Sequence, residues 1–307
     1  MVKVFVSYSH QDAAWVRDRM VPCLEAGGAE VLADYKRFTG GTTVQVQIDT
    51  TQDQADRQVL VLTHAYHASA MCQHEMKRAI AKDPTLNNGV VVVVRRDDTP
   101  VPPSLNATLY ADLRDDSQPA PWDILLTPCS ASLGTTAPHW LEVRDEVVRR
   151  LSDHRSVNLV VSGSVKWRPL IDQVSSAIAP PFPVIDLTDG ATMSRRTLLE
   201  AILRSLGDRS SVPVRDDLAT FSNAMKAKGL TRLGMVRFER ARGRAGFDEK
   251  LHGALRFLAE AKLSQQGFKL LLLIQSRGRF EEILPGEDKN SEAFLHPVFL
   301  SSIQANP

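Results

Sequence analysis

The sequence predicts an α/β protein in which a parallel-sheet domain is followed by a second α/β domain. Apolar strand patterns alternate with helix patterns in short units, which is typical of doubly wound folds. Residues 90–94 are all valine, a composition expected when helices cover both faces of a parallel sheet. The chain has 307 residues, and the alternation starts again at Ser156. It is therefore long enough for two domains of roughly 100–150 residues each.

The first half contains the elements of an open sheet in order. The expected strands cover residues 2–7, 29–33, 58–63, 90–94 and 109–113, and the expected helices cover residues 13–26, 43–57 and 68–81. Asp12 can cap the first helix, and Gly27-Gly28 can end it. Residues 97–138 contain seven prolines, which favours irregular loops with short elements.

The second half repeats the alternation after a helix expected over residues 140–151. Its expected strands cover residues 157–162, 183–187, 233–238 and 269–275, and its expected helices cover residues 168–179, 195–206, 218–228 and 247–261. Ser194 is a plausible cap for the second of these helices. We therefore expect a first domain at residues 1–138, a bridging helix at 139–155 and a second domain at 156–307.

Composition excludes several classes of function. The net charge of +1 predicts no strong attraction to nucleic acid. No apolar stretch approaches the roughly 20 residues that span a bilayer, and the start of the chain has no signal-peptide core, so we expect a cytoplasmic protein. Three scattered cysteines, without zinc-type spacing, predict reduced thiols and no metal site.

The second half is mildly basic. Residues 139–307 hold 25 Lys and Arg against 20 Asp and Glu, and Arg237, Arg240, Arg242 and Arg244 lie close together in the chain. A solvated loop face explains such a cluster, and an acidic or phosphate-bearing partner is the alternative.

Four motifs in the first half occur in a specific order. Residues 4–9 read Val-Phe-Val-Ser-Tyr-Ser and are followed by Asp12. Residues 31–34 form a second strand pattern, and Gly40-Gly41 lies in the loop after it. Residues 59–62 form a third strand pattern. Residues 66–75 then match Tyr-x-x-Ser-x-Trp-Cys-x-x-Glu, except that Met71 stands in place of the tryptophan. Together these motifs, over roughly residues 1–135, resemble a TIR domain of the bacterial, enzyme-type branch, which implies a flavodoxin-like fold.

The resemblance implies NAD+ as substrate, no cofactor, and Glu75 as the catalytic residue that cleaves the bond between ribose and nicotinamide. A carboxylate suits this reaction because the ribose acquires oxocarbenium character, while nicotinamide leaves as a neutral molecule. Ser7, Tyr8, Phe38, Ser69 and Met71 are the candidate substrate-binding residues. Each also has an ordinary alternative role: a glutamate on a helix is usually solvated, and the others can simply cap or pack.

We expect Glu75 to be partly exposed at a sheet edge. The loop over residues 35–42 is expected to contact a neighbouring copy, which implies a homo-oligomer. The leading hypothesis is a regulated NAD+ glycohydrolase in bacterial anti-phage defence. The alternative is a TIR scaffold without enzymatic activity that signals by self-association, and Met71 favours it because methionine cannot stack as an indole does.

The order of elements in the second half resembles a P-loop NTPase of the AAA or STAND kind. Its phosphate-binding motif, GxxxxGK[ST], is absent. Residues 162–168 read Ser-Gly-Ser-Val-Lys-Trp-Arg, and Glu239 is the one acid near the expected acidic motif. We therefore expect Lys166 to be a surface lysine and the domain to be a degenerate NTPase without hydrolysis. It would act in sensing, oligomerisation or docking, with a protein or nucleotide as trigger.

Overall fold

The computed structural model describes residues 1–32, 44–207, 218–284 and 294–302. The chain divides into two compact units, Met1–Leu141 and Glu142–Ser302, and the division falls within helix α7 (Ala137–Ser152). Phe38 and the rest of the loop at 35–42 lie outside the described residues.

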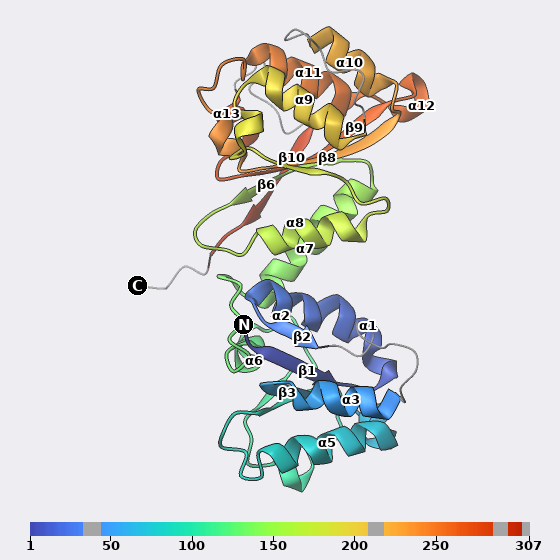
Figure 1. Cartoon of the computed structure of the whole chain (residues 1–307), viewed down its shortest axis with the longest axis vertical. Helices are drawn as coiled ribbons and strands as arrows, with labels where there is room; N and C mark the ends of the chain where they lie inside the picture. Colours follow the sequence, from blue (N-terminus) through green and yellow to red (C-terminus); the bar gives the residue numbers. More distant parts are fainter. Residues whose placement is uncertain (33–43, 208–217, 285–293, 303–307) are drawn as a thin grey trace. The chain divides into compact units, whose positions relative to one another are not determined.

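The first unit is built on a parallel sheet of five strands (Figure 1). The strands are β1 (Lys3–Ser7), β2 (Glu30–Leu32), β3 (Arg57–Leu62), β4 (Val91–Arg95) and β5 (Tyr110–Asp112). Their order is β2-β1-β3-β4-β5, and every pairing is parallel. This is the flavodoxin-like order, so the expected fold class is confirmed.

Helices connect these strands. They are α1 (Ala13–Trp15), which continues through a π-helical segment (Val16–Met20) into α2 (Val21–Gly27), then α3 (Val44–Asp53), α4 (His64–Ala68), α5 (Ala70–Lys82) and α6 (Pro119–Leu126). Helices α1 and α2 lie on one side of the sheet, and α3 and α5 lie on the other (Figure 1).

Two local features of this unit differ from the sequence-based expectations. Asp12 does not cap α1 with its side chain; its carboxylate accepts a hydrogen bond from the Thr63 hydroxyl at 2.8 Å. The helix expected over residues 68–81 is α5, but the sequence pattern did not predict α4 directly before it; Ser69, whose backbone is extended, separates the two helices. The Ser69 side chain accepts a hydrogen bond from the Cys72 amide and so starts α5 as a new helix.

The second unit also contains a parallel five-stranded sheet. Its strands are β6 (Ser156–Val161), β7 (Val184–Asp186), β8 (Leu230–Val236), β9 (Lys269–Ser276) and β10 (Leu295–Leu300), in the order β10-β6-β9-β8-β7. The sequence pattern did not predict β10, which contains Pro297 and pairs with β6 at the sheet edge. An edge strand tolerates proline because one side of it needs no hydrogen-bond donors.

The helices of this unit are α8 (Arg168–Ala177), α9 (Arg195–Ser205), α10 (Leu218–Lys226), α11 (Glu249–Glu260), α12 (Leu263–Gln266) and α13 (Phe280–Ile283). Helix α8 lies on one side of the sheet, and α9 and α11 lie on the other (Figure 1). The expected Ser194 cap is confirmed by a reciprocal capping box with Thr197.

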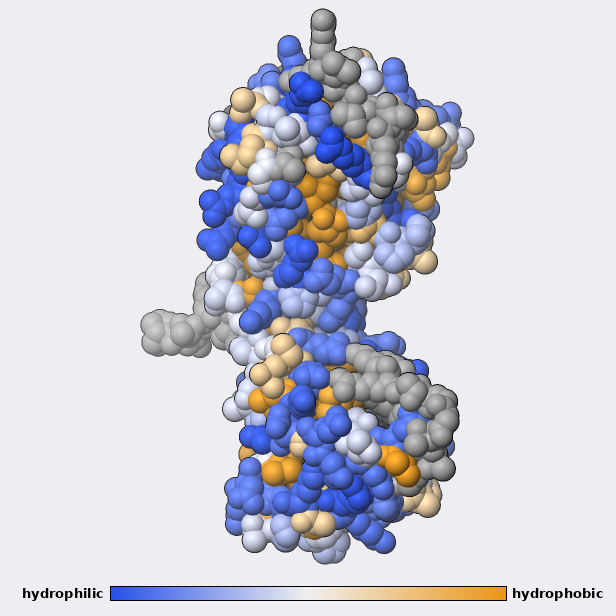
Figure 2. Space-filling view, viewed as in Figure 1, coloured by the Kyte–Doolittle hydropathy of each residue, from blue (hydrophilic) through white to orange (hydrophobic). Residues whose placement is uncertain are grey.

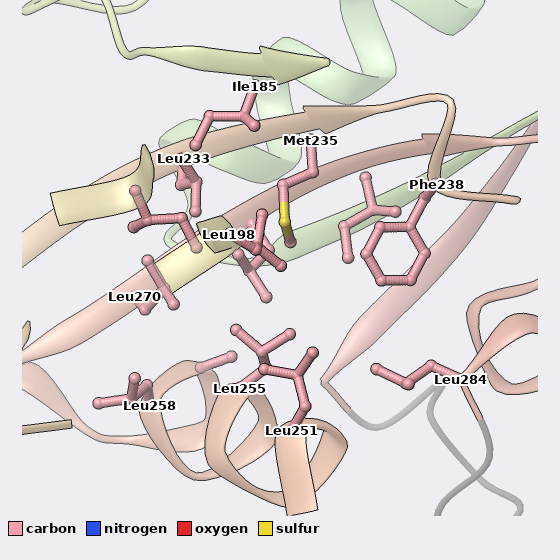
Figure 3. Packing of buried hydrophobic residues seen from close by; sticks show 14 of the residues in the cluster. Ile185, Leu198, Leu233, Met235, Phe238, Leu251, Leu255, Leu258, Leu270 and Leu284 are labelled. Carbon is pink, nitrogen blue, oxygen red and sulfur yellow. The ribbon is translucent and has the colours of Figure 1, made fainter. Parts of the chain in front are cut away.

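Leucine, isoleucine and methionine side chains of α9, α11, β8 and β9, together with Phe238 after β8, form the core between sheet and helices (Figure 3). Outside this core the visible surfaces of both units are mostly hydrophilic, with scattered hydrophobic areas (Figure 2). No described helix combines the length and the apolar character that crossing a bilayer requires.

Candidate functional site

The candidate site lies where β1 ends in the first unit. Ser7 is the last residue of β1, and its Cα is paired with that of Leu60 in β3. Ligands of open parallel sheets bind outside this carboxyl edge. Along β1 the side chains alternate between faces, so Ser7 lies on the same face as Phe5. Phe5 packs in a cluster with Ile48 of α3 and Met71 of α5, which places Ser7 on the side of α5.

Ser7, Tyr66 and Glu75 form a buried hydrogen-bonded group at this edge. The Ser7 hydroxyl donates to the Glu75 carboxylate, and its oxygen lies 2.9 Å from the Tyr66 hydroxyl. Three elements contribute to the group: the end of β1, helix α4 and the second turn of α5. The structure thus brings Ser7 and Glu75 together, although 68 residues separate them in the chain.

The expectation that Glu75 is partly exposed was wrong, because only 6% of its surface is accessible. Helix periodicity explains the difference. Residues three and four apart share one side of a helix, and Glu75 stands on the buried side of α5 with Cys72, Met76 and Ala79. A glutamate on this buried side of α5 faces the sheet, where the Ser7 hydroxyl donates a hydrogen bond to its carboxylate.

Two buried glutamines fix the backbone of α5 at this point. The side-chain nitrogen of Gln52 donates to the carbonyl oxygen of Glu75 at 2.8 Å and to the side-chain oxygen of Gln58 at 2.7 Å. Gln52 comes from α3 and Gln58 from β3, and both are fully buried. The position of Glu75 is therefore set by three elements and not by the helix alone.

The groups around the carboxylate stay neutral near pH 7. Burial raises the pKa of Tyr66 well above its usual value of 10.0; the Ser7 hydrogen bond opposes this shift, and the nearby Glu75 adds to it. Burial also raises the pKa of the Cys72 thiol to about 11, and Glu75 contributes to that shift. Both groups remain protonated, so neither adds a negative charge beside Glu75.

A second set of polar contacts lies beyond β3 and β4. His64, which begins α4, places its Nδ1 2.9 Å from a carboxylate oxygen of Asp97, and its backbone N–H donates to the same oxygen at 2.8 Å. Nearby, burial raises the pKa of Asp12, which accepts from Thr63. These contacts tie the loops after β1, β3 and β4 to one another and hold the edge of the site.

Comparison with known proteins defines the first unit. Residues 4–126 match the family model of the TIR domain. The first unit is a TIR domain. Over 72 residues the chain is 28% identical to human Toll-like receptor 1 and 28% identical to human Toll-like receptor 6, in each case over 24% of this chain and 9% of the receptor. The match thus spans about a tenth of the length of these relatives.

Two solved structures also resemble the chain. The TIR domain of the Toll-related receptor TRR-2 from Hydra magnipapillata is 20% identical, with a TM-score of 0.38, over 42% of this chain and 98% of that one. The ORC2 protein of Aeropyrum pernix, in ADPNP-ADP complexes, is 16% identical with a TM-score of 0.37, over 53% of this chain and 46% of that one.

Within the TIR domain, the other candidate residues lie as follows. Tyr8 is buried directly after β1, and Ser69 is half-buried as the cap of α5. Met71 is half-buried and packs against the cluster that contains Phe5. Their roles in binding remain predictions, as does the role of Phe38.

Sequence reasoning did not assign Tyr66, Gln52 or Gln58 to the site. Tyr66 begins the motif that ends in Glu75, so its position in that motif was an available signal. Gln58 interrupts the otherwise apolar start of β3, and a buried polar residue of this kind needs a hydrogen-bond partner. Nothing local in the sequence indicated Gln52.

The corresponding edge of the second unit departs from a phosphate-binding loop. Strand β6 leads into residues 162–167, and α8 begins at Arg168. Gly163 has a left-handed backbone (φ +72°), and Lys166 is exposed. Residues 162–168 contain no Gly-Lys-Ser/Thr sequence.

Proposed function

We propose that the TIR domain cleaves NAD+ between ribose and nicotinamide, with Glu75 as the catalytic carboxylate. The observation that carries the proposal is the buried Ser7–Glu75–Tyr66 group at the carboxyl edge of β1. When the glycosidic bond breaks, its electron pair leaves with nicotinamide, which departs as a neutral molecule. The ribose is left with oxocarbenium character, and the carboxylate stabilises that positive charge.

The second half of the reaction needs only a nucleophile. Water adds to the ribose carbon and loses a proton to the solvent to give ADP-ribose. Alternatively, a ring nitrogen of the substrate's own adenine adds, the adenine loses a proton to the solvent, and a cyclic form of ADP-ribose results. No general acid is required for departure of nicotinamide. This fits a site in which Tyr66 and Cys72 keep their protons at neutral pH.

The surroundings of Glu75 suit an electrostatic role. An ion pair in a water-poor site interacts more strongly than one in bulk water, and the residue Glu75 is 6% exposed. Ser7 and the Gln52 contact to the α5 backbone hold it in place. A preoriented carboxylate needs little rearrangement as charge develops on the ribose.

The same burial supports regulation by assembly. A ribose has to displace the contacts that cover Glu75 before it can meet the carboxylate, so the described arrangement is one that binding must open. We propose that contact with a second copy, or a trigger at the second unit, promotes this opening. The protein would then act as a regulated, homo-oligomeric effector, and bacterial anti-phage defence is the setting that the sequence resemblance favours.

The alternative function is a TIR scaffold that signals by self-association without turnover. Met71 favours it, because its side chain is half-buried against Phe5 and Ile48 and so contributes to packing at the position where the motif has tryptophan. In the scaffold, the Ser7–Glu75–Tyr66 group would serve only to hold α4 and α5 on the sheet.

Release of nicotinamide from NAD+ by the purified full chain distinguishes the two functions. The assay includes wild type, Glu75→Gln and the matched control Glu25→Gln, which changes an exposed glutamate on α2. It is run from dilute to crowded protein, with light scattering in parallel. Turnover by wild type and Glu25→Gln but not by Glu75→Gln supports the enzyme. Absence of turnover in a wild-type protein that self-associates supports the scaffold.

For the second unit we propose a sensing or docking role without ATP hydrolysis. Without the Gly-Lys-Ser/Thr turn, backbone amides cannot converge on phosphates at the start of α8. We expect no ATPase activity, and we expect Lys166→Ala to leave NAD+ cleavage unchanged. ATP hydrolysis that disappears in Lys166→Ala would contradict this assignment.

A further inference from the structure

A pocket of about 550 Å³ lies at the carboxyl edge of the second sheet. Its walls come from strand ends and from the segments that follow strands. Val161 ends β6 and Gln275 lies near the end of β9, while Arg237 directly follows β8, and Gly163 and Trp167 come from the loop before α8. Both the volume and the position are typical of small-molecule sites in open α/β domains.

The lining is strongly basic. Three arginines, Arg237, Arg240 and Arg277, line the pocket together with one acid, Glu239. Arg237 is partly neutralised, since its guanidinium lies 3.4 Å from an Asp186 carboxylate oxygen. Within the described part of the chain, the side chains of Arg240 and Arg277 form no hydrogen bond or ion pair and are exposed. The pocket therefore presents two uncompensated guanidinium groups.

The backbone around these arginines is held in a defined conformation. Arg237 is left-handed (φ 56°, ψ 41°), a region that costs energy for residues other than glycine. Its N–H donates at 2.9 Å to the side-chain oxygen of Gln275, which is 2% exposed. The N–H of Arg277 donates to Glu239 at 3.3 Å. The Gln275 side chain and the Glu239 carboxylate thus hold the backbone at the ends of β8 and β9 in place.

We propose that this pocket binds a phosphate-bearing ligand of nucleotide size that carries a planar ring. Arginine guanidinium groups match phosphate oxygens in charge and in fork geometry, so Arg240 and Arg277 would bind the phosphates. Trp167, half-buried at the start of α8, offers an indole for stacking with the ring.

The chemistry of this site differs from that of a phosphate-binding loop. Its cations come from the segments after β8 and β9, and Lys166 is not among the lining residues. The ligand is bound and not hydrolysed, which makes the pocket a sensor. The pocket is independent of Glu75 and of the proposed NAD+ cleavage, because it lies at the edge of the other sheet and contacts its ligand through other residues.

Calorimetric titration of the intact chain tests the proposal. The probes are ADP, inorganic pyrophosphate and adenosine. We expect ADP to bind, adenosine to bind at least tenfold more weakly, and the affinity for ADP to fall as salt is raised. Arg240→Ala and Arg277→Ala should each weaken ADP binding tenfold or more. Trp167→Ala should weaken ADP binding but leave pyrophosphate binding within twofold of wild type.

Three variants serve as controls for location. Arg204→Ala removes an exposed arginine that pairs with Glu200 on α9 and should keep ADP affinity within twofold. Lys166→Ala and Glu75→Gln should do the same, which separates this pocket from a loop site and from the TIR domain. Thermal unfolding of each variant confirms that it is folded.

Several results would overturn the proposal. They are no binding of ADP or pyrophosphate at millimolar concentration, equal affinity for adenosine and ADP, or unchanged ADP affinity in a folded Arg240→Ala/Arg277→Ala double variant. A loss in Lys166→Ala or Glu75→Gln as large as in Arg277→Ala would place binding elsewhere. None of these results bears on whether Glu75 cleaves NAD+.

Discussion

Replacing Glu75 by glutamine should remove NAD+ cleavage and leave the fold almost unchanged. The carboxylate accepts a hydrogen bond from Ser7, whose oxygen also lies 2.9 Å from the Tyr66 hydroxyl. A glutamine amide can donate to the Ser7 oxygen, and Ser7 can then donate to Tyr66. Because the Ser7 hydroxyl keeps both of its partners in this arrangement, we expect the free energy of unfolding to change by less than about 1 kcal/mol.

The catalytic loss is expected to be much larger. Two unit charges about 4 Å apart interact by about 4 kcal/mol at an effective dielectric constant of about 20. Losing that attraction between Glu75 and the ribose cation corresponds to a rate decrease of about a thousandfold, since about 1.4 kcal/mol is a factor of ten. Glu75→Ala should lose the same activity and also destabilise the domain by about 1–3 kcal/mol, because Ser7 loses its acceptor in a buried site.

The assay pairs nicotinamide release with urea unfolding for wild type, Glu75→Gln, Glu75→Ala and the exposed control Glu25→Gln. Full turnover by a folded Glu75→Gln variant would refute the catalytic assignment. If Glu75→Gln is as destabilised as Glu75→Ala, then the glutamine amide does not donate to Ser7 in place of the hydrogen bond that Ser7 donates to Glu75.

Three further predictions follow from the TIR domain. Met71→Trp should lower the free energy of unfolding by about 1–3 kcal/mol, because the larger indole overpacks a half-buried position. NAD+ cleavage per folded molecule should be kept or raised. A folded but inactive variant would show that the pocket around residue 71 is built differently. Burial raises the pKa of Cys72 to about 11 and that of Cys129 to about 12, against an ordinary 9.0. Above about pH 9 the folded state therefore keeps thiol protons that the unfolded state loses. The free energy of unfolding, measured in urea, should be constant below about pH 8.5 and fall from about pH 9 upward. An increase over that pH range would contradict this prediction, and Cys129→Ala should make the decrease smaller. The NAD+ cleavage rate per molecule should increase with protein concentration, and Phe38→Ala or Gly41→Pro should reduce that increase. An NAD+ assay combined with light scattering tests this. A constant rate per molecule, in a protein that stays monomeric with its trigger present, would exclude control by assembly.

Much of the fold was available from the sequence because its signals are local. Five consecutive valines predict a covered strand wherever they stand, and β4 is found at Val91–Arg95. The order of motifs from Ser7 to Glu75 predicted the TIR domain that the family model confirms. Ser194 was recognisable as a cap because capping depends on residues only three positions apart.

The tertiary structure alone decided what depends on contacts between distant residues. Glu75 is buried because the side of α5 that it shares with Cys72 and Met76 faces the sheet. Helix periodicity by itself does not say which side of a helix packs against the sheet. Strand β10 is a strand because β6 pairs with it. The arginines of the second unit line one pocket because parallel strands end at a common edge, which brings Arg237 and Arg277 together across 40 residues of chain. Local sequence indicates most of the elements. Strand pairing and the free energy of burying elements against one another determine the remaining ones and which side chains meet.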